Sequence, residues 1–496
     1  MRALVEVAPG DLDELRADLF AAGYTVGRLA ELWGVTASAA LRRGDSWPAR
    51  HVTAASHDPA AVLARLWMLG LAVPREPAMD ALSTSWRVAL DHDLLATTDD
   101  EVRGLVDLSP HSDGEHDWWV VSDQTSMATG DPLHPDHVVG VGGASTTLAS
   151  WTPRPWVERA LDLGTGSGVQ LPHLSSHTKH RVATDVSHRA LRCAALTASL
   201  NDVSVDLRHG SWFDPVAGER FGLVVSNPPF VITPRNDAST LTYRDGGGVG
   251  DEVLESLVRE VGAHLVPGGL AQFLGNWEVV DGAPWHERVG TWVRDSGLDA
   301  LVVQREVVDV SEYAQTWARD AGTPPGSAAA QRWYADSLAD FDQRGVTHVG
   351  FGVVTLQRPS EARPTWTHLE DLRGSLEHPV GPHVLAQLRA RSWLAMHSDE
   401  EVLSVPWTVA VDVTVETVTR PGSPDPLLIR ARQASGFGCV RQLSAVTAGV
   451  LGACDGELSA HQLAVAVAAL LDEDPAQARA ELAIELRAWV AWGLVR

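Results

Sequence analysis

The stretch 161–168, Leu-Asp-Leu-Gly-Thr-Gly-Ser-Gly, leads an apolar strand into a glycine-rich loop that opens a helix. Its glycines stand at alternate positions, whereas the dinucleotide-binding pattern Gly-x-Gly-x-x-Gly would place its third glycine at Val169. Glycines let the backbone approach a ligand closely, and the amino end of a helix attracts a carboxylate. The loop therefore suits a nucleoside ligand that carries an amino acid instead of a pyrophosphate.

An acidic residue, Asp185, ends the next predicted strand. It follows the glycine loop by roughly 20 residues, the distance at which a carboxylate accepts hydrogen bonds from the two hydroxyls of a ribose. An aspartate just before a helix that begins with Ser187 is also an ordinary capping arrangement. Because the spacing from the glycine loop fits a nucleoside, we favour the ribose interpretation.

A third motif, Asn227-Pro228-Pro229-Phe230, follows an apolar strand at 221–226. The Asn227 side-chain carbonyl and the Pro228 backbone carbonyl can accept the two hydrogens of a planar nitrogen, which leaves the nitrogen lone pair free to attack. The prolines hold this acceptor pair rigidly, and Phe230 offers a face for a planar substrate. Asn-Pro is also common where a strand ends in a plain loop, but that alternative is weaker downstream of the glycine loop.

Together these motifs resemble class I S-adenosylmethionine-dependent methyltransferases, in the branch with an Asn-Pro-Pro-Phe or Asn-Pro-Pro-Tyr motif. That branch includes release-factor glutamine methyltransferases and RNA amino-group methyltransferases. The resemblance covers about residues 150–358 and implies S-adenosyl-L-methionine as the cofactor, with residues 140–147 closing over it. It implies that the cofactor is bound by Asp162, Gly164, Thr165, Gly166, Gly168, Asp185, Ser211 and Trp212. The implied catalytic residues are Asn227, Pro228, Pro229 and Phe230.

The substrate is less sharply defined than the cofactor. A glycine-rich loop at 242–251 is similar to one in the glutamine methyltransferases, which also carry an N-terminal helical domain. Against this, Phe230 replaces their usual tyrosine, and Asn-Pro-Pro-Phe is familiar among RNA guanine methyltransferases. We predict N-methylation of a planar amide or amino nitrogen on a macromolecule and favour a protein glutamine over the alternative, an RNA or DNA amino group. A non-catalytic protein that binds the cofactor and a partner is the alternative from another class.

Composition and charge narrow these possibilities. The chain has 496 residues, with 39 Lys and Arg against 64 Asp and Glu, so its net charge is -25. The acidic excess is spread along the chain and disfavours nucleic acid, which would need a local basic patch at residues such as Arg235 and Arg244. The three cysteines form no pattern typical of disulfides or zinc sites. We expect a cytoplasmic protein with no metal site and no membrane segment, and the sequence leaves its oligomeric state open.

Four segments are predicted. Residues 1–110 read as a helical N-terminal domain, and residues 111–150 as a connector that packs on the next domain. Residues 151–360 alternate strands and helices, which predicts a Rossmann-like α/β domain with seven strands. Residues 361–496 are expected to form a C-terminal domain with a small β element and winged-helix-like helices. The seven candidate strands are 158–164, 180–185, 203–208, 221–226, 270–276, 298–306 and 346–357.

Several weaker signals have plain structural interpretations. His173 and His177 are four residues apart on a predicted helix, and we expect them at the surface. The charged stretch 111–117 could bind a metal but is expected to be a solvated loop. Residues 23–35 resemble a helix-turn-helix, although helical packing fits better because acidic residues lie among its arginines. Trp277 and Glu278 fit either the substrate pocket or core packing.

Overall fold

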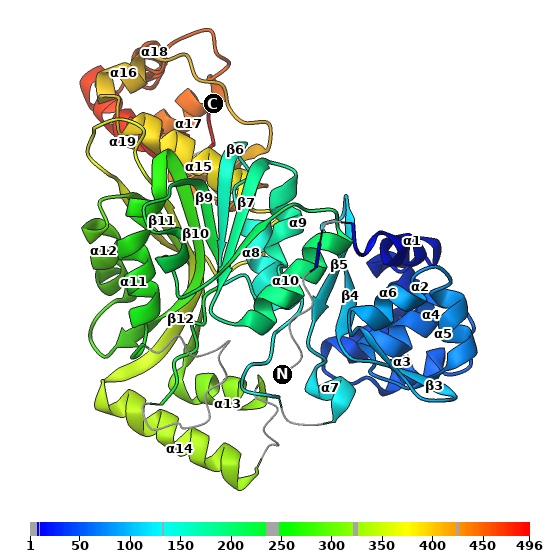
Figure 1. The fold of residues 1–496 in the computed structure, drawn as a ribbon. Coiled ribbons are helices and arrows are strands. Elements are labelled where there is room, and N and C mark those ends of the chain that lie inside the picture. Colours follow the sequence, from blue (N-terminus) through cyan, green and yellow to red (C-terminus); the bar gives the residue numbers. More distant parts are fainter. Residues whose placement is uncertain (1–6, 9, 131–132, 235–247, 321–325, 423–425) are drawn as a thin grey trace.

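The computed structural model describes residues 7–8, 10–130, 133–234, 248–320, 326–422 and 426–496 (Figure 1). A central α/β domain lies between an N-terminal domain on the right of Figure 1 and a C-terminal domain at its top. Among the helices of these described ranges, none is both long enough and apolar enough to cross a membrane.

The central sheet has eight strands in the order β13-β11-β12-β10-β9-β6-β7-β8. The strands are β6 (Val157–Leu163), β7 (Thr178–Asp185), β8 (Asp206–His209), β9 (Phe221–Ser226), β10 (Leu265–Val280), β11 (Asp299–Asp309), β12 (Val346–Gln357) and β13 (Thr367–Asp371). All seven predicted strands are present, but the prediction of a seven-stranded sheet was wrong. The additional strand β13 pairs in parallel with β11, in a segment whose sequence looked irregular, because a strand of five residues on the edge of a sheet needs little apolar pattern.

Both faces of this sheet are buried, as the near-continuous apolar strands predict. Along β9, Val224 packs with α11 and α12 on one face, while Leu223 and Val225 pack with α8 and α15 (Gly381–Leu394) on the other. The helices around the sheet are α8 (Gly143–Trp151), α9 (Gln170–Ser175), α10 (His188–Leu200), α11 (Glu252–Glu260), α12 (Trp285–Asp295), α13 (Val310–Asp320) and α14 (Ala328–Gln343), with short 3-10 turns η2 (Asp214–Val216) and η3 (Val261–His264). Helices α13 and α14 lie below the sheet in Figure 1.

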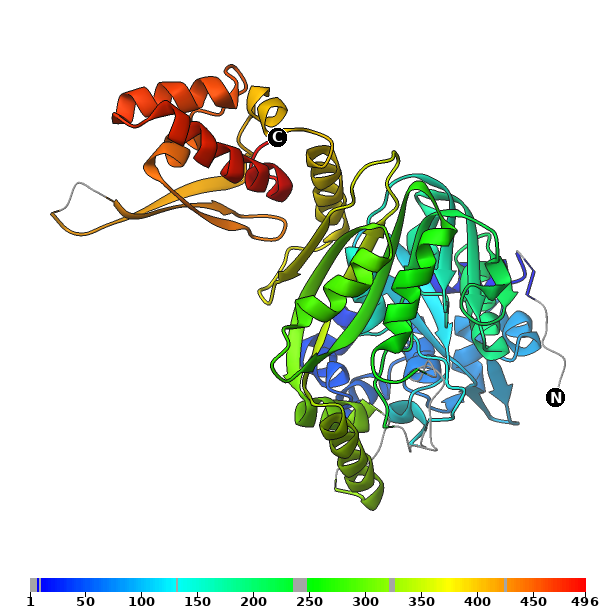
Figure 2. The ribbon, with the colours of Figure 1, turned by 90° about the vertical axis from the view of Figure 1, so that its left-hand side faces the viewer.

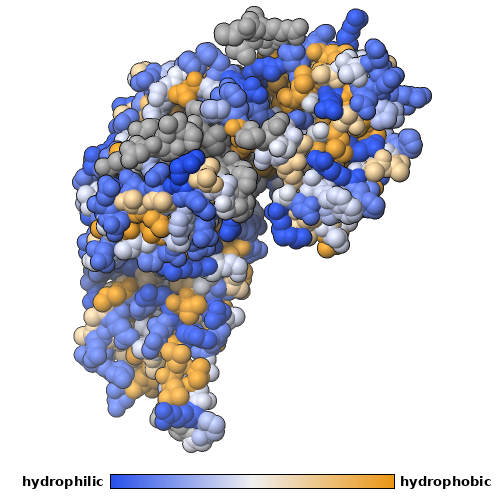
Figure 3. Space-filling model, turned by 90° about the horizontal axis from the view of Figure 1, so that it is seen from below, coloured by the Kyte–Doolittle hydropathy of each residue, from blue (hydrophilic) through white to orange (hydrophobic). Residues whose placement is uncertain are grey.

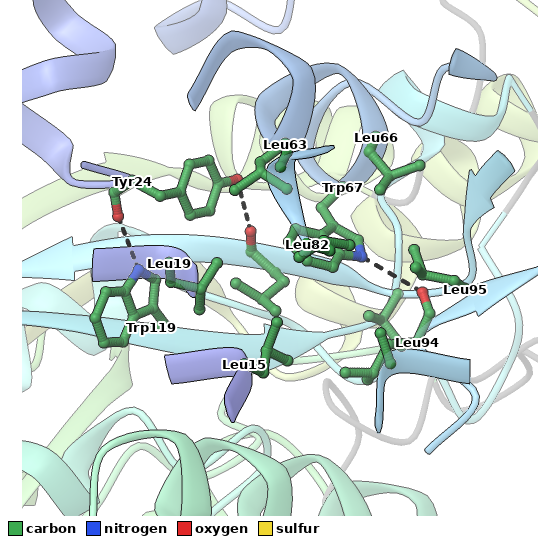
Figure 4. Packing of buried hydrophobic residues seen from close by; sticks show 14 of the residues in the cluster. Leu15, Leu19, Tyr24, Leu63, Leu66, Trp67, Leu82, Leu94, Leu95 and Trp119 are labelled. Carbon is green, nitrogen blue, oxygen red and sulfur yellow. Dashed lines mark hydrogen bonds between the residues drawn. The ribbon is translucent and has the colours of Figure 1, made fainter. Parts of the chain in front are cut away.

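The N-terminal domain combines helices with short strands. Its elements are α1 (Asp13–Ala21), α2 (Val26–Arg42), α3 (Trp47–Thr53), α4 (Pro59–Leu63), the π-helix η1 (Ala64–Met68), α5 (Arg75–Ala81), α6 (Trp86–Asp91) and the strands β1 (Val73–Pro74), β2 (Leu95–Thr97) and β3 (Glu101–Gly104). Within α2, Gly34 has φ 67°, so the helix is interrupted at the turn of the segment that resembles a helix-turn-helix. The core of this domain gathers leucines around Tyr24, Trp67 and Trp119 (Figure 4).

A hairpin connects the N-terminal and central domains. Its strands are β4 (Asp107–Ser112) and β5 (Asp117–Ser122), followed by the short helix α7 (Ser126–Thr129). On one side, the Tyr24 hydroxyl donates to the Leu108 carbonyl and Trp119 Nε1 donates to the Tyr24 carbonyl, both at 2.8 Å (Figure 4). On the other side, the Val121 N–H donates to Thr197 of α10 at 3.0 Å. The hairpin therefore belongs to both cores.

The structure corrects the prediction for two histidines. His173 of α9 is only 5% exposed, because His111 of β4 packs against it. His177 lies beyond the end of α9 and is 7% exposed, with its Nδ1 3.1 Å from the Pro155 carbonyl oxygen. His173 Nε2 lies 2.8 Å from His111 Nε2, and burial lowers the pKa of His173 to about 3, so the pair is neutral at pH 7. No cluster of three or more potential metal ligands occurs in the part of the chain that the structure describes.

The C-terminal domain contains both helices that the sequence predicts at its end, α18 (Ala460–Leu471) and α19 (Pro475–Trp492). They pack with α15 (Gly381–Leu394), α16 (Asp399–Ser404) and α17 (Ala445–Gly452) around an apolar core. An antiparallel sheet of β14 (Val413–Thr419), β15 (Pro426–Gln433) and β16 (Val440–Leu443) lies below these helices in Figure 2 and contributes Ala431 and Leu443 to the same core. The winged-helix-like assignment stays a prediction.

Candidate active site

A cavity of about 500 Å³ lies at the carboxyl ends of β6, β7 and β9. This is where open α/β sheets bind ligands, and the volume suits a small molecule. Every residue predicted to bind cofactor or to act in catalysis lines this cavity, with the exception of Gly168. The structure therefore brings together residues from three separate motifs.

The glycine loop leaves room for a ligand at two positions and for a helix at the third. Gly164 and Gly166 have φ of 69° and 55°, and a Cβ at either would meet nothing within 4 Å. Gly168 has φ 77°, and a Cβ there would lie 3.0 Å from the Ala194 Cα of α10. Gly164 and Gly166 thus open the loop towards the cavity, whereas Gly168 lets the loop pack against α10.

Two carboxyl groups lie near each other on the cavity wall, with Asp162 buried and Asp185 half-buried. Asp162 is 2% exposed and accepts a hydrogen bond from the Thr165 hydroxyl at 2.6 Å. Burial, with a smaller contribution from the charge of Asp185, raises the pKa of Asp162 to about 7. Burial also raises the pKa of Asp185. No lysine or arginine is found among the described residues that line the cavity, so a cationic ligand would relieve the repulsion between these two groups.

The Asp185 carboxylate is already oriented by the backbone. Its Oδ2 accepts the Gly166 N–H at 2.9 Å, and its Oδ1 accepts the Ser187 N–H at 2.8 Å. The Ser187 side chain in turn caps α10 by accepting the Ala190 N–H. The local capping arrangement and a place on the cavity wall therefore coexist at Asp185, since each carboxylate oxygen has capacity for a further hydrogen bond.

Strained backbone occurs on the cavity wall at Trp212, one of the predicted cofactor-binding residues. Trp212 lines the cavity with φ 45°, a conformation that bulky residues rarely adopt. Gly210, two residues earlier, lies so close to Pro215 that a Cβ would approach the proline ring at 2.5 Å. Such strain persists where the surrounding structure enforces it, often at binding sites.

The Asn-Pro-Pro-Phe loop presents an acceptor without a protein donor. The Asn227 Oδ1 is buried at the cavity and accepts no hydrogen bond from the residues that the structure describes. Leaving a buried acceptor unpaired costs about 1–3 kcal/mol, and because this one faces the cavity, a bound ligand could supply the missing donor. At the start of the loop, the Ser226 hydroxyl donates to the Leu163 carbonyl at 2.7 Å, which ties β9 to the strand of the glycine loop.

Sequence motifs did not predict two other parts of the wall. Asp136 to Val139 line the cavity beside the predicted 140–147 segment, of which Gly140 and residues 142–145 also do so. The Ser167 hydroxyl holds this segment by donating to the Val139 carbonyl at 2.7 Å. Trp317 and Asp320 come from α13, far along the chain. No local pattern distinguishes them from other residues of an amphipathic helix.

Two remaining expectations concern residues near the site. Trp277 is fully buried and donates to Gln304 at 2.8 Å, while Glu278 pairs with Arg344, so neither residue lines the cavity. Most of the glycine-rich 242–251 loop, together with Arg235, lies outside the described residues.

Comparison with known proteins agrees with this geometry. A family model described as "Methyltransferase small domain" matches residues 140–278. Residues 140–278 form a class I S-adenosylmethionine-dependent methyltransferase domain. A second model, described as "Domain of unknown function (DUF7059)", matches residues 21–105, so it precedes the methyltransferase domain in the chain.

Curated relatives resemble part of this chain. A release factor glutamine methyltransferase of Xylella fastidiosa is 35% identical over 159 residues, which is 30% of this chain and 56% of the relative. A ribosomal protein uL3 glutamine methyltransferase of Bradyrhizobium diazoefficiens is 35% identical over 160 residues, which is 30% of this chain and 49% of the relative. This chain thus spans about half the length of these two relatives. A solved methyltransferase of Pyrococcus furiosus covers 43% of this chain and 80% of its own, with 15% identity and a TM-score of 0.26.

Proposed function

We propose that this protein is an S-adenosylmethionine-dependent N-methyltransferase that acts on a planar amide or amino nitrogen of a macromolecule. The observation that carries the proposal is the buried Asn227 Oδ1, which lines the cavity and accepts no hydrogen bond within the described structure. A bound acceptor amide would supply the missing N–H donor. The cavity thus offers what the chemistry of a poorly nucleophilic nitrogen requires.

The roles of the residues follow from their positions. The glycine loop and the two carboxyl groups would hold S-adenosylmethionine, which supplies an electrophilic methyl group when bound. Asn227 Oδ1 and the Pro228 carbonyl would accept the two N–H hydrogens and direct the nitrogen lone pair towards that methyl group. Transfer of that methyl group would form a nitrogen–carbon bond in place of the sulfur–carbon bond and would release S-adenosylhomocysteine and a proton. Catalysis rests on positioning and hydrogen-bond acceptance rather than on a covalent enzyme intermediate.

A protein glutamine is the favoured acceptor. The charged side chains on the described cavity wall are the four aspartates Asp136, Asp162, Asp185 and Asp320. They would repel the phosphates that flank a nucleotide, whereas an uncharged amide meets no such repulsion. The two curated relatives are named as glutamine methyltransferases, which supports the same acceptor.

The test is transfer of a tritiated methyl group from S-adenosylmethionine to a cell lysate. We expect labelled macromolecules whose label disappears after protease treatment and survives ribonuclease treatment. Loss of label with ribonuclease would instead favour the RNA acceptor. Tight cofactor binding without transfer to any fraction would contradict the enzymatic proposal and favour a non-catalytic cofactor-binding protein.

A further inference from the structure

Helix α13 brings two side chains to the cavity that no motif predicts. Its residues Trp317 and Asp320 line the same cavity as Asn227 and Phe230. The helix belongs to segment 310–345, which joins the antiparallel neighbours β11 and β12. A tight turn of two residues can join such strands. The sheet therefore does not need this long connection. The connection instead adds residues of α13 to the cavity wall.

Trp317 is positioned by aromatic rings on both the loop and its own helix. Its ring lies 6.3 Å from that of Phe230 at an interplanar angle of 73°, and 6.0 Å from that of Tyr313 at 61°. Edge-to-face contacts of this kind are preferred by aromatic pairs. Tyr313 precedes Trp317 by four residues, so the two side chains are neighbours on one helix face. Trp317 thus has a defined place beside the Asn-Pro-Pro-Phe loop.

The anchor of this arrangement is Tyr313, which is 1% exposed. Its hydroxyl accepts the Ile232 N–H and the Asn276 side-chain amide, each at 2.8 Å. Its ring also packs edge-to-face on Phe341 of α14, with the centroids 5.7 Å apart. Because Ile232 lies two residues after Phe230, α13 and the Asn-Pro-Pro-Phe loop are held by one buried group. The relative position of Trp317 and Asn227 is therefore fixed by the fold.

We propose that Trp317 determines substrate specificity, forming with Phe230 an aromatic recess that receives the planar acceptor group beside Asn227. This inference rests on the proposed function and identifies the side chains that select its acceptor. Amides and heteroaromatic rings both pack well against aromatic rings. Asp320 is three residues further along the same helix face and adds a carboxylate, so the recess selects uncharged or cationic groups over anionic ones.

The test measures binding without requiring methyl transfer. The full-length protein is saturated with S-adenosylhomocysteine, and binding of N-acetylglutamine amide, guanosine and guanosine 5′-monophosphate is followed by saturation-transfer NMR. We expect one or both neutral probes to bind, and the monophosphate to bind more weakly than guanosine if guanosine binds. Trp317→Ala should weaken binding of the neutral probes about tenfold, and Trp317→Phe should retain most of it. Affinity for S-adenosylhomocysteine should stay unchanged in both variants.

The matched control is Trp333→Ala on α14. Trp333 is also half-buried, and its Nε1 donates to the Ala314 carbonyl of α13 at 3.2 Å, but it does not line the cavity. Probe binding should survive this change. The proposal is overturned if the wild type binds neither neutral probe, or if Trp317→Ala binds them as the wild type does. It is also overturned if Trp317→Ala and Trp333→Ala lose binding equally. Failure of the proposed function would show separately, as absence of methyl transfer by wild type.

Discussion

The two halves of the cavity are built in different ways. The half where we expect the cofactor is made by consecutive strand ends, with Asp162 and Asp185 and the glycine loop between them. The acceptor half combines the Asn227 loop with Trp317 from a helix far along the chain. The first half relies on backbone conformation and the second on side chains carried by a long connection. A common α/β core can therefore keep its cofactor site while the acceptor changes with the connection.

The largest expected effect tests whether the acceptor half can lose its function while the cofactor half still binds S-adenosylmethionine. Asn227→Ala should reduce methyl transfer by about 10²- to 10³-fold, because it removes an acceptor that acts on the reacting nitrogen. Affinity for S-adenosylmethionine, measured by calorimetry, should stay close to wild type, which also shows that the variant is folded. A variant that keeps most of its activity would remove Asn227 from the catalytic role.

The next effect belongs to the cofactor half. Asp185→Ala should weaken S-adenosylmethionine binding by about 10- to 100-fold. This is the loss of affinity expected when one or two charge-assisted hydrogen bonds to the ligand are removed. Asp185→Asn should be milder, because the amide oxygen still accepts one backbone N–H. Asp206→Ala is the matched control, since Asp206 starts the next strand and pairs with Arg208 at the surface. Unchanged affinity in Asp185→Ala would refute the ribose role.

A smaller effect concerns pH. Burial raises the pKa of Asp162 to about 7, so its carboxyl is protonated below that pH and ionised above it. A cofactor that carries sulfonium and ammonium charges prefers the ionised form. Its dissociation constant should therefore rise about tenfold between about pH 8 and pH 6. Calorimetry at both values checks this, and Asp162→Asn should flatten the profile. Equal wild-type affinity at the two pH values would contradict the assignment.

The smallest effect concerns residues 136–139, which line the cavity. Arg189 donates two hydrogen bonds to Asp123, at 2.7 and 2.6 Å, and Asp123 also accepts the Val138 N–H beside the cavity. Because the Arg189 side chain is 52% exposed, the pair is worth at most about 1 kcal/mol. Arg189→Met should weaken cofactor binding only about two- to fivefold. Lys179→Met, which breaks a surface pair with Glu158, should leave it unchanged. If the two variants behave alike, Asp123 does not hold this segment through Arg189.

Sequence patterns predicted well where the signal is local. The strand into Leu163, the loop at Gly164 and Gly166, and the helix after Ser187 depend on residue periodicity and backbone freedom within a few residues. Prediction failed where distant segments meet. His173 looked like a surface residue because its helix was considered alone, but the hairpin that covers it is formed some 60 residues earlier. Gly168 belonged to the motif, yet its packing against α10 became visible only in three dimensions.

By itself, the sequence determined the α/β domain, the glycine loop and the cofactor class, because each depends on short-range spacing within a strand, loop and helix. The role of Asn227 as the acceptor of substrate N–H groups stays a prediction. The tertiary structure alone decided that β13 joins the sheet, that Asn227 Oδ1 has no donor among the described residues, and that Trp317 lies against Phe230. These features depend on long-range packing. Strand order and helix docking, which no local pattern encodes, set which side chains share a cavity.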